Sequence, residues 1–182
     1  MLVSLVGLPG VGKSTIGRQL ARRLDFAFAD CDALIEARLQ ERIRDYFDRE
    51  GEEAFRDREE AMLAELVCAD RTVIATGGGI VLRAANRRVL HERTECVYLH
   101  AQPADLFGRL RRDTKRPLLQ VADPLARLRE LSAQREPLYR ESAWLVVGAA
   151  GVPRGAVIET IIRALARRTG STGVDAVDGS VT

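Results

Sequence analysis

Cysteine is scarce in this sequence, and long apolar runs are missing. The three cysteines, Cys31, Cys68 and Cys96, stand far apart and form no C-x-x-C pair. An odd number of separated cysteines argues against a disulfide framework and against a zinc site, and it fits a reducing cytoplasm. No apolar run approaches the length that a bilayer requires, and the first residues lack the basic segment of a signal peptide. We therefore expect a soluble, unprocessed cytoplasmic protein with no membrane partner.

A large excess of charge of either sign is also absent. The 182 residues include 28 Lys+Arg and 26 Asp+Glu, which leaves a formal net charge of +2. This balance gives no sign that a nucleic acid is the main partner. The length suits one α/β domain with a full core and is short for two domains of ordinary size.

Lysine is nearly absent, since only Lys13 and Lys115 among the 28 Lys+Arg residues are lysines. Lys13 lies in a segment that follows the apolar run Leu2 to Val6 and matches G-x-x-x-x-G-K-[ST] at every fixed position. The segment reads Gly7-Leu8-Pro9-Gly10-Val11-Gly12-Lys13-Ser14-Thr15. This pattern is the signature of a phosphate-binding loop. A chain that otherwise uses arginine has a lysine where a compact ammonium is required.

The chemistry of the loop explains its residue types. Its glycines let backbone N–H groups surround a polyphosphate, and Lys13 brings a positive charge to the β- and γ-phosphates. The Ser14 hydroxyl can join the coordination of Mg²⁺, and the N-terminus of the following helix attracts anions. The loop predicts a bound polyphosphate and a hard cation, and it names no acceptor.

Short β-like runs alternate with longer amphipathic segments, which is typical of a parallel sheet covered by helices on both faces. The expected strands are Leu2 to Val6, Phe26 to Asp30, Thr72 to Thr76, Glu95 to Leu99 and Trp144 to Val147. The expected helices are Lys13 to Leu24, Ala33 to Leu39, Glu52 to Ala69, Arg83 to Glu92, Ala104 to Arg112, Pro124 to Arg135 and Arg154 to Arg168. In such sheets ligands bind at the carboxyl ends of the strands.

Two segments fall outside this alternation. The stretch from Arg111 to Asp123 is charged and has no convincing core face, so we expect a mobile flap there. Residues 169–182 consist mainly of Gly, Ser, Thr, Val and Asp without periodicity. We expect this tail to be disordered and to have no part in the chemistry.

Two acids, Asp30 and Asp32, end the second expected strand. Their spacing places both carboxylates on one side if the chain stays extended. Asp30 is a candidate ligand of Mg²⁺ through water, and Asp32 is a candidate acceptor for the proton of an attacking hydroxyl. The competing interpretation is that Asp32 caps the helix that follows it.

Arg56 is a candidate for binding an anionic substrate group. It follows Phe55 in the apolar register of a helix, and Glu59 and Glu60 stand three and four residues further on. We expect the guanidinium to project inward, held in place by these acids.

Three consecutive glycines, Gly77, Gly78 and Gly79, follow the third expected strand and favour backbone contact with a substrate. Arg116 lies in the expected flap, and Arg135 lies just before Pro137, where we expect the helix to end. Phosphoryl transfer needs arginines at fixed positions, because charge develops on the transferred group.

Together these motifs resemble the shikimate kinase family. The resemblance covers residues 2–168 and rests on five elements that occur in the family order. The elements are Gly7 to Thr15, Asp30-Cys31-Asp32, Phe55-Arg56, Gly77-Gly78-Gly79, and Arg116-Pro117-Leu118-Leu119 with Arg135-Glu136-Pro137-Leu138-Tyr139. The resemblance implies a three-layer α/β/α fold like that of the nucleoside monophosphate kinases, with a five-stranded parallel sheet of order 2-3-1-4-5.

The resemblance also implies the reaction and the domain plan. The reaction is phosphorylation of the 3-hydroxyl of shikimate by ATP in the presence of Mg²⁺, by a protein that we expect to be a monomer. A single P-loop kinase domain would cover residues 1–168. Within it a lid would lie at about 112–122 and a substrate-binding helical part at about 32–60.

Roles for individual residues follow from the same resemblance. The implied catalytic residues are Lys13, Asp32 and Arg116, and the implied Mg²⁺ ligands are Ser14 and Asp30. ATP is implied to contact Gly10, Val11, Gly12, Lys13, Ser14, Thr15, Arg109, Arg116, Pro153 and Arg154. Shikimate is implied to contact Asp32, Arg56, Gly77, Gly78, Gly79 and Arg135, with the two arginines at its carboxylate.

Two other classes of function compete with this interpretation. A P-loop kinase of another small hydroxy acid, such as gluconate, would share the arginines, and only the glycine and acid elements favour shikimate. A nucleotide switch of the G-protein kind needs a guanine-reading N-K-x-D stretch, which the sequence lacks.

Overall fold

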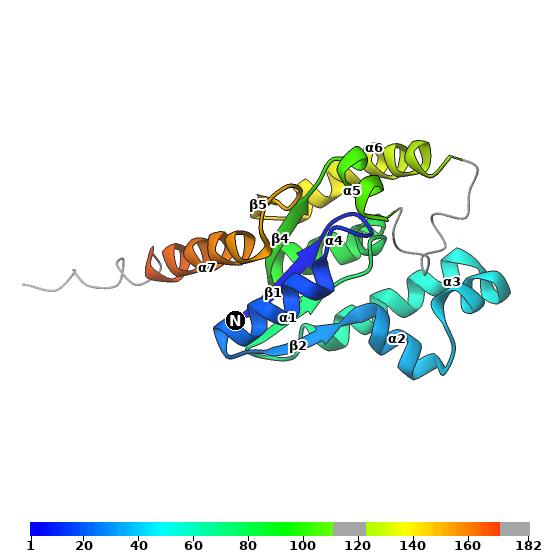
Figure 1. Cartoon of the computed structure of the whole chain (residues 1–182). Helices are drawn as coiled ribbons and strands as arrows, with labels where there is room; N and C mark the ends of the chain where they lie inside the picture. The colour runs from blue at the N-terminus through cyan, green and yellow to red at the C-terminus, as the bar shows by residue number, and fades with distance from the viewer. Residues whose placement is uncertain (111–122, 172–182) are drawn as a thin grey trace, which may run out of the picture.

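A five-stranded parallel sheet forms the middle of the structure, a computed structural model that describes residues 1–110 and 123–171 (Figure 1). The strands are β1 Leu2–Val6, β2 Ala27–Asp30, β3 Thr72–Ala75, β4 Glu95–His100 and β5 Leu145–Gly148. Their spatial order is β2-β3-β1-β4-β5, and each neighbouring pair is parallel. The predicted α/β class and the strand order 2-3-1-4-5 are confirmed.

Helices cover both faces of this sheet. They are α1 Lys13–Leu24, α2 Cys31–Leu39, α3 Ile43–Leu66, α4 Ala84–Arg93, α5 Pro103–Leu110, α6 Pro124–Ser142 and α7 Arg154–Ser171, with a short 3₁₀ helix η1 Ile80–Leu82. On one face α1 contacts β1, β2, β3 and α7, and on the other α4 and α6 contact each other and β4 (Figure 1). None of the helices in the described ranges has the length and apolar character needed to cross a membrane.

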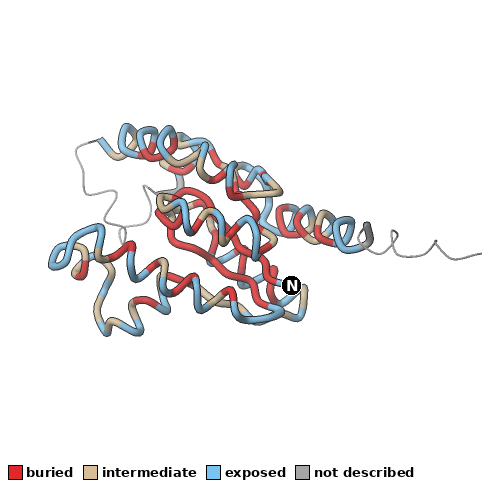
Figure 2. Tube along the Cα trace, turned by 180° about the vertical axis from the view of Figure 1, so that it is seen from behind, coloured by how far each residue is buried: buried red, intermediate tan, exposed pale blue. Residues whose placement is uncertain are grey.

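The inner strands are apolar because helices cover them on both sides. Every residue of β1 and β3 is buried, whereas the edge strand β2 is partly exposed. Figure 2 shows the buried residues gathered in the middle of the molecule and the exposed ones on the outer helix surfaces. The parallel pairing brings the carboxyl ends of β1, β2 and β3 to one edge of the sheet, next to the phosphate loop.

A second, smaller apolar cluster lies where α2 and α3 pack together. It contains Cys31, Ile35, Tyr46, Phe55 and Met62. Helix α3 bends at Gly51, where φ is 85° and ψ is 175°, a conformation that residues other than glycine rarely adopt. The helix begins at Ile43. The prediction placed its start at Glu52, because Gly51 interrupts the apolar period of the sequence.

The prediction that the sixth helix ends before Pro137 is wrong, because α6 continues to Ser142. Proline removes one backbone hydrogen bond, and contacts beyond it hold the last turns in place. The Tyr139 side chain is buried and its hydroxyl donates to the Gly78 carbonyl at 2.5 Å. The Ser142 hydroxyl donates to the Leu138 carbonyl at 2.8 Å. Arg135 therefore lies inside the helix and not at its end.

Two predictions fall largely outside the described residues. The flap, with Arg116, lies in the segment 111–122, and the tail beyond Ser171 lies in 172–182. Helix α7 extends to Ser171, three residues beyond the predicted Arg168.

Candidate active site

The phosphate loop joins β1 to α1, so that Lys13 is the first residue of the helix. Gly12 precedes it with a φ of 103°, a left-handed conformation that glycine adopts without strain. The buried ammonium of Lys13 donates to the carbonyls of Gly7 at 2.7 Å and Leu8 at 3.1 Å. The charge is thus held over the loop, beside a helix N-terminus that itself attracts anions.

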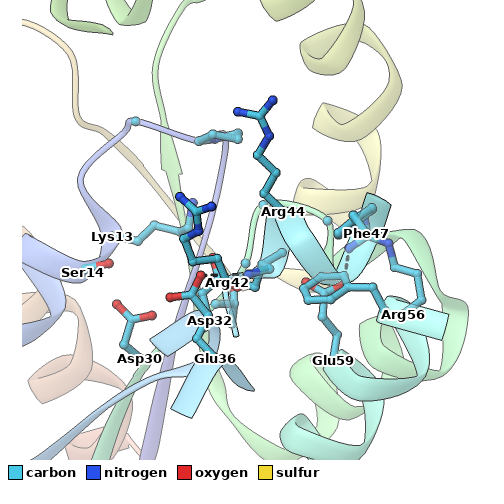
Figure 3. A pocket seen from close by; sticks show the side chains of 18 of the residues that line it. Lys13, Ser14, Asp30, Asp32, Glu36, Arg42, Arg44, Phe47, Arg56 and Glu59 are labelled. Carbon is cyan, nitrogen blue, oxygen red and sulfur yellow. Dashed lines mark hydrogen bonds and ion pairs between the residues drawn. The ribbon is translucent and has the colours of Figure 1, made fainter. Parts of the chain in front are cut away.

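A cavity of about 910 Å³ opens beside this loop, a size typical of small-molecule sites. The loop, the end of β2, helix α3, the three glycines after β3 and helix α6 all line it (Figure 3). The predicted residues among those that line it are Gly10, Gly12, Lys13, Ser14, Thr15, Asp30, Asp32, Arg56, Gly77, Gly78, Gly79 and Arg135. The fold therefore brings most of the predicted donor and acceptor residues to one cavity.

Asp30 is the last residue of β2, and Asp32 does not continue the strand. Helix α2 begins at Cys31, and Asp30 is its N-cap, with a carboxylate that accepts from the Ala33 N–H at 3.3 Å. Asp32 lies in the first helical turn. The extended chain assumed from the spacing is not formed, and the interpretation of Asp32 as the cap is wrong because Asp30 has that place. Figure 3 shows both carboxylates on the side of Lys13 and Ser14.

The surroundings of Asp32 favour its protonated form. Burial raises the pKa of Asp32, and the charge of Asp30 acts in the same direction, while Lys13 opposes both. A carboxylate with a raised pKa is a better proton acceptor in its ionised form.

Arg56 projects inward, as predicted, and acids on its own helix hold it. Its Nη1 donates to the carboxylate of Glu59, whose side chain is 1% exposed. Its Nε and Nη2 donate to Glu52 Oε1 at 3.2 and 2.7 Å. Glu60 is not a partner of Arg56, because it faces the start of α4, where it accepts from Arg83 at 2.9 Å.

Two of the three glycines after β3, Gly77 and Gly79, give these charged side chains room. A Cβ on Gly77 would lie 2.5 Å from Glu59 Oε1 and 2.6 Å from Asp32 Oδ1, and a Cβ on Gly79 would overlap the guanidinium of Arg56. Larger residues would therefore displace the acid and the arginine that line the cavity. Backbone contact with a substrate stays a prediction.

Arg135 lines the cavity and has a buried donor. Its Nε is buried and has no hydrogen-bond partner in residues 1–110 and 123–171. Burial raises the pKa of Tyr139, one turn further along α6, and the charge of Arg135 partly offsets that effect. Buried donors are seldom left without a partner, so Arg135 suits an anionic group of a ligand.

Three other predicted residues, Val11, Pro153 and Arg154, are not among the described residues that line the cavity. The Val11 side chain is buried in the main core, and its N–H donates to the Leu8 carbonyl at 3.3 Å. Pro153 and Arg154 are exposed at the start of α7. Arg109 lies in α5, and Arg116 lies outside the described residues. These assignments stay predictions.

The cavity also has residues that sequence reasoning missed. They are Glu36, Arg42, Arg44, Phe47, Asp48, Glu52 and Arg127. Three of them, Arg44, Phe47 and Asp48, lie on the part of α3 before Gly51, which the helical period did not reveal. Glu52 had a usable signal, since it stands four residues before Arg56, one helical turn away.

The residues around the loop fit a magnesium ion. Ser14 offers a hydroxyl and Asp30 a carboxylate, of which only Oδ1 is used in capping α2. Mg²⁺ prefers oxygen ligands and is usually bound by one or two carboxylates together with substrate phosphates and water. The donor set is therefore of the right chemical kind.

The sheet order, the phosphate loop and the adjoining cavity of acids and arginines define a P-loop kinase with a nucleoside-monophosphate-kinase-like fold. The family model described as shikimate kinase matches residues 9–166. A shikimate kinase of Paracidovorax citrulli is 49% identical over 174 residues, which cover 94% of this chain and 93% of that protein. The chain belongs to the shikimate kinase family.

Solved structures agree with this family. A shikimate kinase from Acinetobacter baumannii in complex with shikimate has a TM-score of 0.87 and 38% identity, covering 92% of this chain and 93% of that one. A gluconokinase from Sinorhizobium meliloti has a TM-score of 0.60 and 16% identity, covering 96% of this chain and 97% of that one. The second likeness reflects the shared fold alone.

Proposed function

We propose that this protein transfers the γ-phosphoryl group of ATP to the 3-hydroxyl of shikimate and forms shikimate 3-phosphate and ADP. The observation that carries the proposal is the position of Asp32 in one cavity with the phosphate loop and with Arg56 and Arg135. A hydroxyl acceptor with a carboxylate suits this combination of a proton acceptor and two guanidinium groups. Family membership supports the choice of shikimate over gluconate.

On the donor side, the loop residues bind the phosphates of ATP. Backbone N–H groups of the loop and the ammonium of Lys13 stabilise the charge that develops on the transferred group. Ser14 and Asp30 would hold Mg²⁺, Asp30 through water, and the ion would supply further positive charge at the phosphates.

On the acceptor side, Asp32 orients the 3-hydroxyl and takes its proton. The new bond joins the shikimate oxygen to the γ-phosphorus, and the bond from that phosphorus to the β–γ bridging oxygen breaks. Arg56 and Arg135 bind the substrate carboxylate. The backbone of Gly77 to Gly79 forms the wall beside them.

Further contacts complete the proposal. We assign Arg116 to a lid that reaches the phosphates, and Arg109, Pro153 and Arg154 to the surroundings of the adenine. Val11 would contact ATP only through its backbone, because its side chain is buried in the main core. We also propose that the protein acts in the cytoplasm as a monomer.

An assay that couples ADP release to a colour change tests the proposal against its rival. Shikimate, gluconate, quinate and nucleoside monophosphates are compared at equal concentration, and a reaction without acceptor measures background ATP hydrolysis. We expect turnover above background with shikimate. Turnover with another acceptor and none with shikimate would overturn the proposal.

A further inference from the structure

The protein's own carboxylates accept hydrogen bonds from all three nitrogens of the Arg56 guanidinium. Glu52 Oε1 accepts from both Nε and Nη2, at 3.2 and 2.7 Å, while Nη1 donates to Glu59. A carboxylate binds arginine most strongly through two parallel hydrogen bonds from one edge of the planar group. Glu52 thus lies on the Nε–Nη2 edge and also takes Nη2 from the Nη1–Nη2 edge, which are the two edges where a carboxylate can bind in this way.

Repulsion between carboxylates makes the position of Glu52 matter for substrate binding. Arg56, Arg135 and Arg127 bring three positive charges to the cavity, and Glu52 and Glu59 bring two negative ones. A substrate carboxylate on Arg56 would lie next to Glu52, and two carboxylates that share a site repel each other.

The two glutamates differ in their ability to leave. The Glu59 side chain is 1% exposed and packs beside Gly77, whereas the Glu52 side chain is 57% exposed and follows the bend at Gly51. Glu52 can swing its carboxylate out into the solvent by changing its rotamer, because a charge in water is well solvated. Hydrogen bonds from Arg56 lower the pKa of Glu52, and the charges of Arg135 and Arg127 act in the same direction. Glu52 therefore competes as an anion.

We infer that the Glu52 carboxylate occupies the substrate-carboxylate position on Arg56 and must be displaced each time an acidic acceptor binds. Glu52 then sets the affinity of the site for anionic acceptors without taking part in phosphoryl transfer. This inference rests on the proposed function, since it concerns the carboxylate of that acceptor.

Two variants test the competition, Glu52→Gln and Glu52→Ala, with Glu53→Gln as the matched control. Glu53 is the next residue on the same helix, its side chain is 91% exposed, and it pairs with Arg83 away from the cavity. The control removes the same charge from the same helix. The Michaelis constants for shikimate and ATP and the kcat are measured for all four proteins, and circular dichroism checks that each is folded.

We expect the shikimate KM to fall about twofold to fivefold in both Glu52 variants, as for the loss of one competing, largely exposed ion pair. The ATP KM and the kcat stay unchanged, and Glu53→Gln behaves like the unmodified protein. The uncharged carboxamide of shikimate provides a second test, because it is not repelled by the Glu52 carboxylate and binds Arg56 more weakly, so its KM should fall less than that of shikimate in the Glu52 variants.

The outcomes separate this inference from the function on which it rests. If the unmodified protein phosphorylates shikimate and both Glu52 variants keep or raise its KM, Glu52 supports Arg56 and the competition is refuted. An equal fall in KM for the carboxamide also refutes it. No turnover of shikimate by the unmodified protein overturns the proposed function and this inference together.

Discussion

The acids around the cavity differ in how their surroundings treat a negative charge. Burial raises the pKa of Asp32, and the charge of Lys13 opposes that effect. Burial also raises the pKa of Glu59, and there Arg56 opposes it. Hydrogen bonds from Arg56 instead lower the pKa of Glu52. The three carboxylates therefore suit three roles, a proton acceptor, a fixed support for Arg56 and an exchangeable anion.

At the scale of the single residue, Asp32→Asn tests the proton acceptor. We expect kcat to fall by roughly two to four orders of magnitude, because the amide cannot take the proton of the 3-hydroxyl. ATP binding, measured by calorimetry, stays unchanged. Asp57→Asn is the control, since Asp57 is exposed and pairs with Arg83. A kcat close to that of the unmodified protein would remove Asp32 from the chemistry.

Arg135→Ala tests the arginine of α6 that lines the cavity, at the same scale. Losing charged hydrogen bonds to a carboxylate should raise the shikimate KM about tenfold to a hundredfold and leave the ATP KM nearly unchanged. Arg140→Ala provides the control, because Arg140 is on the same helix but is exposed and bound to Glu136. Equal rises in both Michaelis constants would contradict the assignment of Arg135 to the substrate carboxylate.

At the scale of the element, the bend in α3 positions one side of the cavity. The part of α3 before Gly51 places Arg44, Phe47 and Asp48 at the cavity, and the part after Gly51 places Arg56 and Glu59 there. A straight helix would carry the first set in a different direction. The bend therefore shapes the acceptor end of the cavity, with a single glycine as the cause.

Gly51→Ala tests the bend. No atom lies within 4 Å of a Cβ added there, so the effect comes from the backbone conformation alone. Strain of about 1–3 kcal/mol should lower the free energy of unfolding by that amount. Gly155→Ala, also in open space but inside α7, should leave stability unchanged or raise it by up to about 1 kcal/mol. Equal effects in urea denaturation would show that the bend imposes no strain.

At the scale of the whole molecule, the phosphate loop ties ligand binding to folding. The loop connects β1 with α1, and both belong to the main core. A ligand that binds only the folded chain stabilises it, by about 2.7 kcal/mol at one hundred times its Kd. The loop therefore links nucleotide binding to the stability of the whole sheet.

This linkage predicts a thermal shift. ADP with Mg²⁺ at one hundred times Kd should raise Tm by about 5–11 °C, from about 2–4 °C per kcal/mol in a chain of this size. Removing Mg²⁺ with a chelator should reduce the shift, and Lys13→Ala should reduce it further. A shift in Lys13→Ala as large as in the unmodified protein would contradict the role of the loop lysine.

The sequence by itself determined the parts that depend on local patterns. The phosphate loop, the strand and helix alternation, the exact span of α1 and the inward face of Arg56 all follow from residue spacing within a few turns or strands. The acids, glycines and arginines of the site were also recognisable one by one, because each stands at the end of an element or on a periodic face.

Only the tertiary structure decided how residues from different elements meet. It assigns Glu60 to Arg83 and not to Arg56, and it carries α6 through Pro137 because Tyr139 reaches Gly78. It also gives Gly77 and Gly79 their reason, since the charged side chains that need the space come from other elements. Contacts between distant segments depend on packing in three dimensions, which no local period contains.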